Sequence, residues 1–134
     1  MEITRETDYA IRCILYMAKE PEKIFIVNEI AGSQLIPKSF LAKILQKLGR
    51  AGLVESIRGV KGGFQLAKKP KEINLLDVII AIEGTVAMNR CAIDKRMCNL
   101  SNTCTVHPIW VDMRKEVERR LRKYDFARLA AQKR

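Results

Sequence analysis

Hydrophobic residues recur every three or four positions in three stretches of the first half of the chain, which is the spacing of one face of an α-helix. The first stretch covers residues 4–19. The second is a short helix over residues 28–31, which we expect to break at Gly32-Ser33. The third covers residues 37–49 and has Pro37 in its first turn, where an N–H group would have no partner anyway. Two short helices joined by a tight turn predict a helix-turn-helix.

Two short apolar runs follow, and they indicate a β-hairpin. Residues 53–57 and residues 64–67 have the composition of strands, and the six residues between them include three glycines. Glycine adopts the positive φ angles that a tight turn needs. A glycine-rich hairpin directly after a helix-turn-helix is typical of a wing.

One more helix completes this unit. Asn74 and Asp77 have the spacing of a capping pair, and Gly84 is placed to end the helix that they begin. The pattern therefore predicts a mainly α fold with a small β-hairpin wing, in which a winged helix-turn-helix domain occupies residues 1–84.

The second half of the chain holds a loop and a long helix. Residues 85–107 show no clear periodicity, whereas residues 108–134 predict a long amphipathic helix and a basic tail with a frayed end. If the helix extends away from the domain, its apolar stripe needs a partner, and a second copy of the chain is the simplest one. The alternative is that the helix packs on its own domain. The expected dimerisation residues are Trp110, Met113, Val117, Leu121 and Tyr124.

The net charge of +10 is unevenly distributed. Residues 36–69 contain eight Lys or Arg and only one acidic residue, Glu55, which is a net charge of +7. Double-stranded DNA is the partner that such a basic domain fits, and a solvated basic face is the alternative. The chain has no apolar run of about 18 residues and no secretory signal at its start, so we expect a cytoplasmic protein that does not enter membranes.

The third helix and the wing carry the candidate DNA contacts. Ser39 and Gln46 can read base edges, and lysines on the same helix can bind phosphates. Cations on the wing would enter the adjacent minor groove. The expected DNA-binding residues are Lys38, Ser39, Lys43, Gln46, Lys47, Arg58, Gly59 and Lys61. A two-fold dimer would read a roughly palindromic site with half-sites about one helical turn apart.

Three cysteines and the single histidine lie close together at Cys91, Cys98, Cys104 and His107, in the pattern Cys-x6-Cys-x5-Cys-x2-His. In a reducing compartment, clustered cysteines indicate metal or redox chemistry. An iron–sulfur cluster, a zinc ion, or bare thiols that oxidise would each suit this set. Cys13 lies apart from the others and is expected in the core.

An enzyme is not expected, because the chain has one histidine and no recognisable nucleophile–base pair. We therefore expect no small-molecule substrate. The best rival to a DNA-binding regulator is an adaptor protein in which the basic face binds an acidic protein and the cysteines hold zinc.

Several ordered motifs resemble one family. They are Thr7-Asp8-Tyr9-Ala10-Ile11-Arg12, Glu29-Ile30-Ala31, Ala51-Gly52-Leu53-Val54, and Arg58-Gly59-x-x-Gly62-Gly63-Phe64. Together they resemble the IscR/NsrR-type winged-helix transcription regulators of the Rrf-two family. The resemblance implies a dimeric repressor or activator whose affinity for DNA is controlled by an iron–sulfur cluster, for sensing of redox state, nitric oxide or cluster supply.

The same resemblance implies the ligands of that cluster. Each protomer would supply Cys91, Cys98 and Cys104, and the fourth ligand would be either His107 or Asp8 of the partner's first helix. The spacing departs from the usual pattern by one residue, which leaves the cluster type open, with [2Fe–2S] preferred to [4Fe–4S]. Ala42 stands where some members place a base-reading glutamate, so promoter specificity does not carry over.

Overall fold

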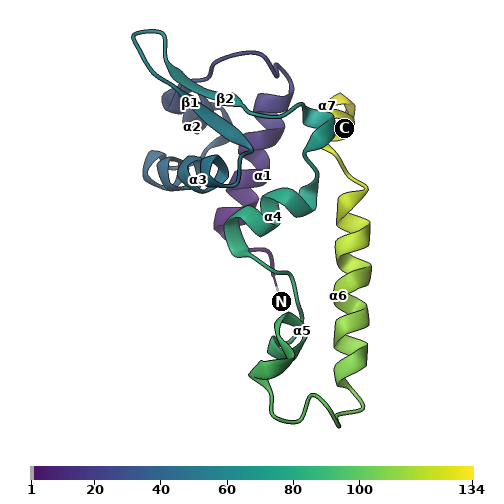
Figure 1. Ribbon diagram of the computed structural model, residues 1–134. Helices are drawn as coiled ribbons and strands as arrows, with labels where there is room; N and C mark the ends of the chain where they lie inside the picture. The colour runs from purple at the N-terminus through teal and green to yellow at the C-terminus, as the bar shows by residue number, and fades with distance from the viewer. Residues whose placement is uncertain (1) are drawn as a thin grey trace.

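The computed structural model describes residues 2–134 and is mainly helical with one β-hairpin. In chain order its elements are α1 (Arg5–Ala18), α2 (Val27–Gln34), α3 (Lys38–Arg50), β1 (Val54–Ile57), β2 (Gly63–Leu66), the 3-10 helix η1 (Pro70–Glu72), α4 (Leu75–Glu83), α5 (Arg90–Ile93), the 3-10 helix η2 (Lys95–Met97), α6 (His107–Arg122) and α7 (Phe126–Ala131). Figure 1 shows an upper body made of α1 to α4, the hairpin and α7, and a long α6 that runs from the lower end of the molecule to that body.

The body has one hydrophobic core. The helices α1, α3 and α4 pack against one another, and α2 packs on α1 and α3. Each helix contributes the apolar positions that recur at helical spacing. The largest fully buried side chains of α1 to α3 are Ile14, Met17, Ile30, Leu41, Ile44, Leu45 and Leu48.

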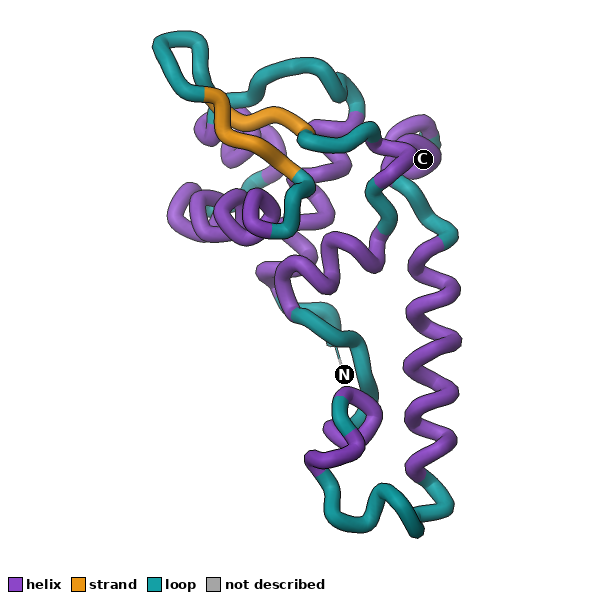
Figure 2. The backbone as a smooth tube through the Cα atoms, in the orientation of Figure 1, coloured by secondary structure: helices purple, strands orange, loops and turns teal. Residues whose placement is uncertain are grey.

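The hairpin forms the predicted wing. Val54 pairs with Leu66 and Ile57 pairs with Gly63 in an antiparallel ladder. On the other side of β2, the backbone of Phe25 exchanges two hydrogen bonds with the backbone of Phe64, each 2.7 Å long. The base of the wing is thereby joined to the segment between α1 and α2, while its tip leaves the body, as the tube in Figure 2 shows. The winged-helix fold predicted from the sequence is confirmed.

The second helix is longer than the predicted one. The expected break at Gly32-Ser33 is wrong, because α2 continues to Gln34. The helix ends at Leu35, which adopts a left-handed conformation with φ of 55° and ψ of 47° and directs the chain into α3. Gly32 has a helical backbone conformation and open space where a Cβ atom would lie. The structure therefore does not require glycine at this position.

The start of α4 confirms the predicted capping pair. The Asn74 side chain accepts a hydrogen bond from the Asp77 backbone N–H at 2.9 Å, and the Asp77 carboxylate accepts one from the Asn74 N–H at 3.0 Å. This reciprocal arrangement satisfies two N–H groups that a helix leaves unpaired at its start.

The last segment contains a helix that was not predicted, and this helix includes Ala130 and Ala131, which were expected at the frayed end. The final residues form α7 up to Ala131, and Phe126 is fully buried in the core of the body. The backbone around it joins α6 to the body, since the Phe126 N–H donates to the Ile73 carbonyl at 2.9 Å and the Leu75 N–H donates to the Tyr124 carbonyl at 3.0 Å. One aromatic residue after the long helix, in a basic stretch, carries too weak a periodicity to predict this short helix.

Across residues 2–134, no helix has the length and apolar character needed to cross a membrane.

Candidate nucleic-acid interface and cysteine site

The exposed face of α3 is polar and basic. Ser39, Lys43, Gln46 and Arg50 follow one another at intervals of four, three and four residues, which places them on one side of the helix. All four are exposed. The opposite side is the buried stripe that fixes the helix in the body. This side of α3 carries one hydroxyl and three amide or cationic groups, which are the kinds of group that proteins use to bind base edges and phosphates.

Two of the predicted lysines of α3 lie outside this stripe. The Lys47 ammonium group forms an ion pair with the Glu6 carboxylate of α1 at 2.7 Å, which turns it toward α1. Lys38 is exposed in the first turn of the helix. Arg50 belongs to the stripe, although it was not among the expected contacts, and its helical spacing from Lys43 and Gln46 was the signal that could have included it.

The wing presents its basic residues at an exposed tip. Arg58, Gly59 and Lys61 are exposed, and Gly59 has a φ of 111°, which L-amino acids rarely adopt. The Gly62 N–H donates to the Gly59 carbonyl at 3.0 Å and closes the turn. A Cβ atom on Gly62 would overlap the Ile57 carbonyl oxygen, so the turn has no room for a side chain there. Glycine is therefore required at the tip for two separate reasons, the dihedral angle and the space.

The cysteine-bearing segment lies at the lower end of the molecule. Cys91 is buried on α5, which packs against α6, and His107 is the first residue of α6. Cys98 and Cys104 are exposed in the turns between these helices. Within residues 2–134, no three His, Cys, Asp or Glu side chains lie close enough together to hold a metal ion.

The turns that separate the cysteines are held by short-range bonds. The Ser101 N–H donates to the Cys98 carbonyl at 3.3 Å, and the Cys104 N–H donates to the Leu100 carbonyl at 2.8 Å. The Arg96 guanidinium donates to the Asp94 carboxylate at 2.8 Å and holds the pKa of that carboxyl below its usual range. Each of these bonds joins residues of the same loop, so the loop can rearrange without disrupting the core.

The chemistry of the donors fits a metal centre. The Nδ1 atom of His107 is buried and has no hydrogen-bond partner in the described structure. A buried polar atom without a partner loses its hydration and gains nothing in return, unless a ligand or proton donor reaches it. Three thiols and an imidazole are suitable ligands for an iron–sulfur cluster or for zinc. The chemical types of these four side chains therefore suit an iron–sulfur cluster or a zinc ion. For such a centre to bind, the loop would have to change conformation and bring Cys98 and Cys104 to it.

Asp8 lies on α1 and is already paired. Its carboxylate accepts hydrogen bonds from the Arg12 guanidinium at 2.7 Å and 3.2 Å, and the same guanidinium donates to the Gln34 carbonyl at 3.1 Å. Both bonds from Arg12 reach the Oδ2 atom of Asp8, and the side chain is exposed, so the pair leaves the Oδ1 atom accessible to a ligand.

Cys13 is separate from the other cysteines and belongs to the core, as predicted. It is fully buried, and desolvation raises the pKa of its thiol to about 12. At neutral pH it is therefore an uncharged, inert side chain.

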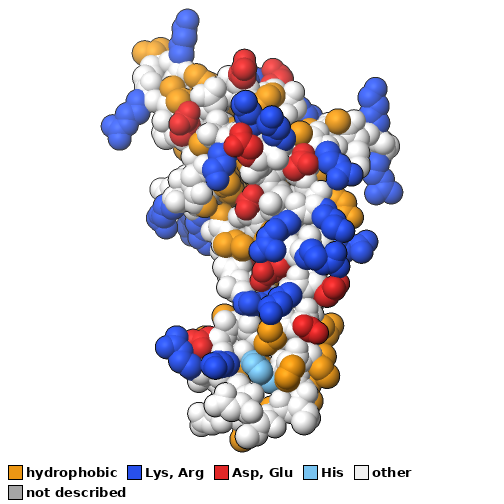
Figure 3. All heavy atoms as spheres, turned by 45° about the vertical axis from the view of Figure 1, so that its right-hand side comes forward, with side chains coloured by type: hydrophobic (Ala, Val, Ile, Leu, Met, Phe, Trp, Pro, Cys, Tyr) orange, Lys and Arg blue, Asp and Glu red, His pale blue; other side chains and the backbone are white. Residues whose placement is uncertain are grey.

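The long helix α6 buries none of its residues, unlike α1, α3 and α4. Val117 and Leu121 line a hollow of about 250 Å³ that they share with Ile79 of α4, and both are half-buried. Met113 is exposed, and Trp110 and Tyr124 are half-buried. Figure 3 shows hydrophobic side chains gathered toward the lower end of this side of the molecule, below a zone rich in Lys and Arg.

Comparison with known proteins gives a consistent family. A family model described as Rrf2, "Iron-dependent Transcriptional regulator", matches residues 3–132. The chain is 44% identical over 91 residues to Protein aau3 of Rhizobium meliloti, which covers 68% of this chain and 59% of that protein. It is 36% identical over 109 residues to the HTH-type transcriptional regulator NsrR of Shouchella clausii, which covers 81% of this chain and 70% of that protein.

A solved structure has the same fold. The structure of CymR, the global cysteine regulator of B. subtilis, superposes with a TM-score of 0.79 over 100% of this chain and 99% of that chain, at 24% sequence identity. This likeness shows the fold alone, and the sequence matches show the family. The family model and the NsrR relative are described as transcription regulators and not as enzymes, as the lack of a nucleophile–base pair led us to expect. The chain is a member of the Rrf2 family of DNA-binding transcription regulators.

Proposed function

We propose that this protein is a homodimeric regulator whose affinity for promoter DNA is controlled by an iron–sulfur cluster bound between α5 and α6. The observation that carries the proposal is the buried, unpartnered Nδ1 of His107 at the first turn of α6, beside the helix that holds the buried Cys91. The description of the family as iron-dependent supports it.

The DNA would be read by α3 and the wing. Ser39 and Gln46 would contact base edges, while Lys43 and Arg50 would contact phosphates or guanine. Arg58 and Lys61 would enter the minor groove beside it, since a narrow minor groove attracts cations. Lys47 is held by Glu6 and would contribute less than Lys43.

The dimer would form through α6. Val117 and Leu121 face a hollow that their own domain leaves unfilled, and Met113 and Ile109 are exposed on the same helix. A second copy would cover these side chains and bury apolar area that is otherwise in contact with water. Two reading heads related by a two-fold axis fit a roughly palindromic site.

The cluster would be held by Cys91, Cys98, Cys104 and His107. When bound, a cluster with one non-cysteine ligand supplies a centre that reacts with oxidants or nitric oxide, because that position is readily lost. His107 is favoured over Asp8 of the partner, because the Nδ1 atom of His107 is buried without a hydrogen-bond partner and lies on the helix that packs against α5. [2Fe–2S] remains preferred to [4Fe–4S].

Binding of the cluster would change the affinity for DNA through the cysteine-bearing loop and α6. The loop 94–106 has only local hydrogen bonds, so ligation of Cys98 and Cys104 would order it against α5 and the start of α6. The orientation of α6 sets the distance between the two reading heads of a dimer. Cluster binding shifts the equilibrium between two arrangements of the dimer only if one arrangement holds the cluster more tightly. DNA affinity then changes only if the two arrangements also differ in their affinity for DNA.

A second candidate is a regulator that senses through its thiols without a cluster. The exposure of Cys98 and Cys104 favours it, because exposed thiols are accessible to oxidants. In that case the thiols themselves would be oxidised, and His107 would not matter for the signal.

Anaerobic purification separates the two candidates. We expect brown protein with iron, acid-labile sulfide and visible absorption, and we expect Cys98→Ala to lose all three while Cys13→Ala keeps them. Selection from a random duplex library would supply the DNA site, and the affinity for that site with and without the cluster would then be compared. Colourless protein whose DNA affinity depends on thiol oxidation would establish the second candidate, and one zinc per chain would make the site structural.

A further inference from the structure

A groove runs along the side of the body that faces away from α3 and the wing tip. It is bounded by the end of α1, β2, η1 and α7, and it has a volume of about 800 Å³. In Figure 1, α7 and η1 lie on the right-hand side of the body, while α3 and the tip of the hairpin lie on its left-hand side. Neither the DNA contacts nor the cysteines use this groove.

The groove exists because its lining side chains are small. Ala127, Ala130 and Ala131 lie on one face of α7, and Ala18 and Ala67 line the groove from α1 and from the end of β2. The wall opposite α7 is fixed, since the Gln65 side chain donates to the Glu22 carbonyl at 2.8 Å. The floor is therefore apolar, because it is made of short alanine side chains whose backbone is held in place by the fold.

The rim of the groove is basic. Lys19, Lys68, Lys69 and Lys71 line it and are exposed, and none of them forms an ion pair with another residue of the range 2–134. Two acidic residues, Glu22 and Glu55, also line the groove. Four positive charges against two negative charges leave a net charge of +2 around an apolar floor.

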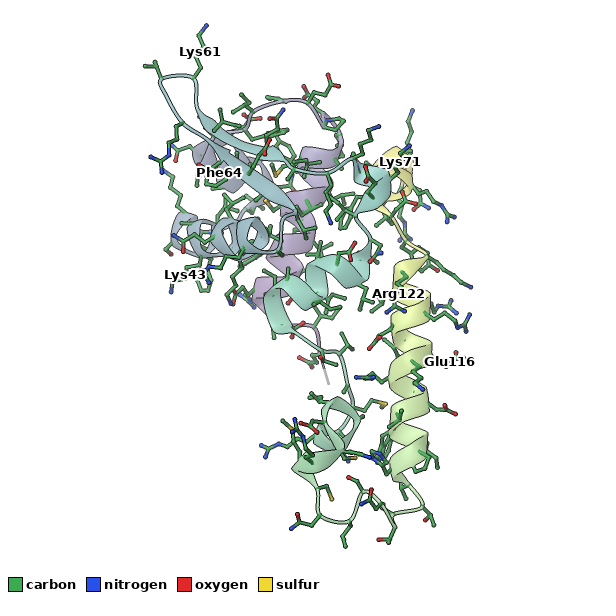
Figure 4. All side chains as sticks on the ribbon, viewed as in Figure 1. Lys43, Lys61, Phe64, Lys71, Glu116 and Arg122 are labelled. Atoms are coloured by element: carbon green, nitrogen blue, oxygen red, sulfur yellow. The ribbon has the colours of Figure 1, made fainter. Side chains whose placement is uncertain are left out.

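This basic rim does not belong to the DNA-reading surface. Figure 4 shows Lys71 on the opposite side of the body from Lys43 and Lys61. A duplex bound along α3 and the wing would leave the groove accessible. In the dimer proposed above, a second copy of the chain covers α6 and not this groove, and a further copy of a chain with a net charge of +10 would bring like charges to the lysine rim.

We infer that this groove binds an acidic peptide segment of a partner protein while the regulator is on DNA. Small apolar side chains of the segment would pack on the alanine floor, and its carboxylates would pair with Lys68, Lys69 and Lys71. Exposed ion pairs add little individually, so the apolar floor and several lysines together would give the affinity.

The test uses a fluorescein-labelled peptide of twelve residues with alternating glutamate and alanine, at about 0.05 M salt, where exposed charges are weakly screened. Titration into the full-length, nitrogen-15-labelled protein should shift the amide signals of residues 18–22, 65–71 and 127–131. Fluorescence anisotropy should show binding about tenfold weaker for Lys68→Glu with Lys71→Glu, since two attractions become repulsions. Ala127→Trp, at an exposed position, should weaken binding by filling the floor without disturbing the core.

The matched control is Lys43→Glu with Lys61→Glu, which changes the net charge equally on the DNA-reading surface. This double variant should leave peptide affinity within about twofold. Equal loss in both double variants would mean attraction to net charge only, and would overturn the proposal. Shifts confined to residues 38–61, no shifts at millimolar peptide, or a change of oligomeric state with Ala127→Trp would overturn it as well.

Discussion

The Arg12 guanidinium joins Asp8 to the end of α2, because it donates to the Asp8 carboxylate at 2.7 Å and to the Gln34 carbonyl at 3.1 Å. The same guanidinium carbon lies 5.1 Å from the centre of the Tyr9 ring. Arg12 thus links α1 to the helix-turn-helix, and the exposed Asp8 carboxylate orients its guanidinium through Oδ2.

Two variants test which side chain completes the cysteine site. If the unpartnered Nδ1 of His107 is the ligand, His107→Ala should change the visible spectrum of the anaerobically purified protein and speed cluster loss in air, whereas Asp8→Asn should leave both unchanged. The measurement is absorption against time after exposure to oxygen. If Asp8→Asn alters the spectrum and His107→Ala does not, the partner's carboxylate is the ligand.

The four thiols should differ in reactivity in metal-free protein. Cys98 and Cys104 are exposed and should be alkylated by iodoacetamide first, and the buried Cys91 should follow more slowly. Cys13 should react only on unfolding, because its thiol is fully buried with a pKa raised to about 12 and the thiolate is the nucleophile. Mass spectrometry of timed samples at pH 8 gives the order. Early labelling of Cys13 would contradict the described core.

Leu35 holds an unfavourable backbone conformation for a residue with a side chain. It has a φ of 55° and is 80% exposed, so little burial opposes the strain of about 1–2 kcal/mol. Leu35→Gly should raise the free energy of unfolding by about 0.5–1 kcal/mol, after the extra entropy of unfolded glycine is subtracted. Leu35→Ala keeps a Cβ atom and should give no such gain. The measurement is urea unfolding of the unaltered protein, Leu35→Gly and Leu35→Ala. Equal unfolding midpoints for the glycine and alanine variants would show that the strain is absent.

The wing turn should tolerate no side chain at Gly62. A Cβ atom there would overlap the Ile57 carbonyl oxygen, so Gly62→Ala should displace the tip and weaken specific DNA binding by at least about fivefold. The body should stay folded, because the tip contributes nothing to the core. Gly32→Ala, in open space on α2, serves as the control and should leave DNA affinity unchanged. A gel-shift titration with circular dichroism of each variant checks both statements.

Much of the fold could be predicted from the sequence because its signals are local. The apolar spacing of α1 and α3 and the Asn74–Asp77 pair each depend on residues within a few positions of one another, and each is confirmed. The end of α2 at Leu35 was missed because a left-handed residue at a helix end is usually glycine, and leucine rarely adopts this conformation. The burial of Phe126 was missed because the cavity that receives it is built by residues far away in the sequence.

The candidate site was less predictable than the fold. The spacing of the cysteines and His107 identified suitable ligands, but the positions of Cys98 and Cys104 depend on turns with only short-range bonds. Likewise, the charge excess of residues 36–69 was assigned to DNA, whereas Lys68 and Lys69 line the groove on the other side of the body. A count of charges along the chain carries no information about which face of the fold they occupy.

The backbone hydrogen bonds of Ile73 and Leu75 with Phe126 and Tyr124 tie the C-terminal end of α6 to the body. The 16 residues of α6 span about 24 Å at 1.5 Å per residue. A rotation of about 10° about this tied end would move the His107 end by about 4 Å. A shift of a few ångströms in the cysteine loop would therefore correspond to a small rotation where α6 meets the start of α4, a helix that packs against the reading helix α3.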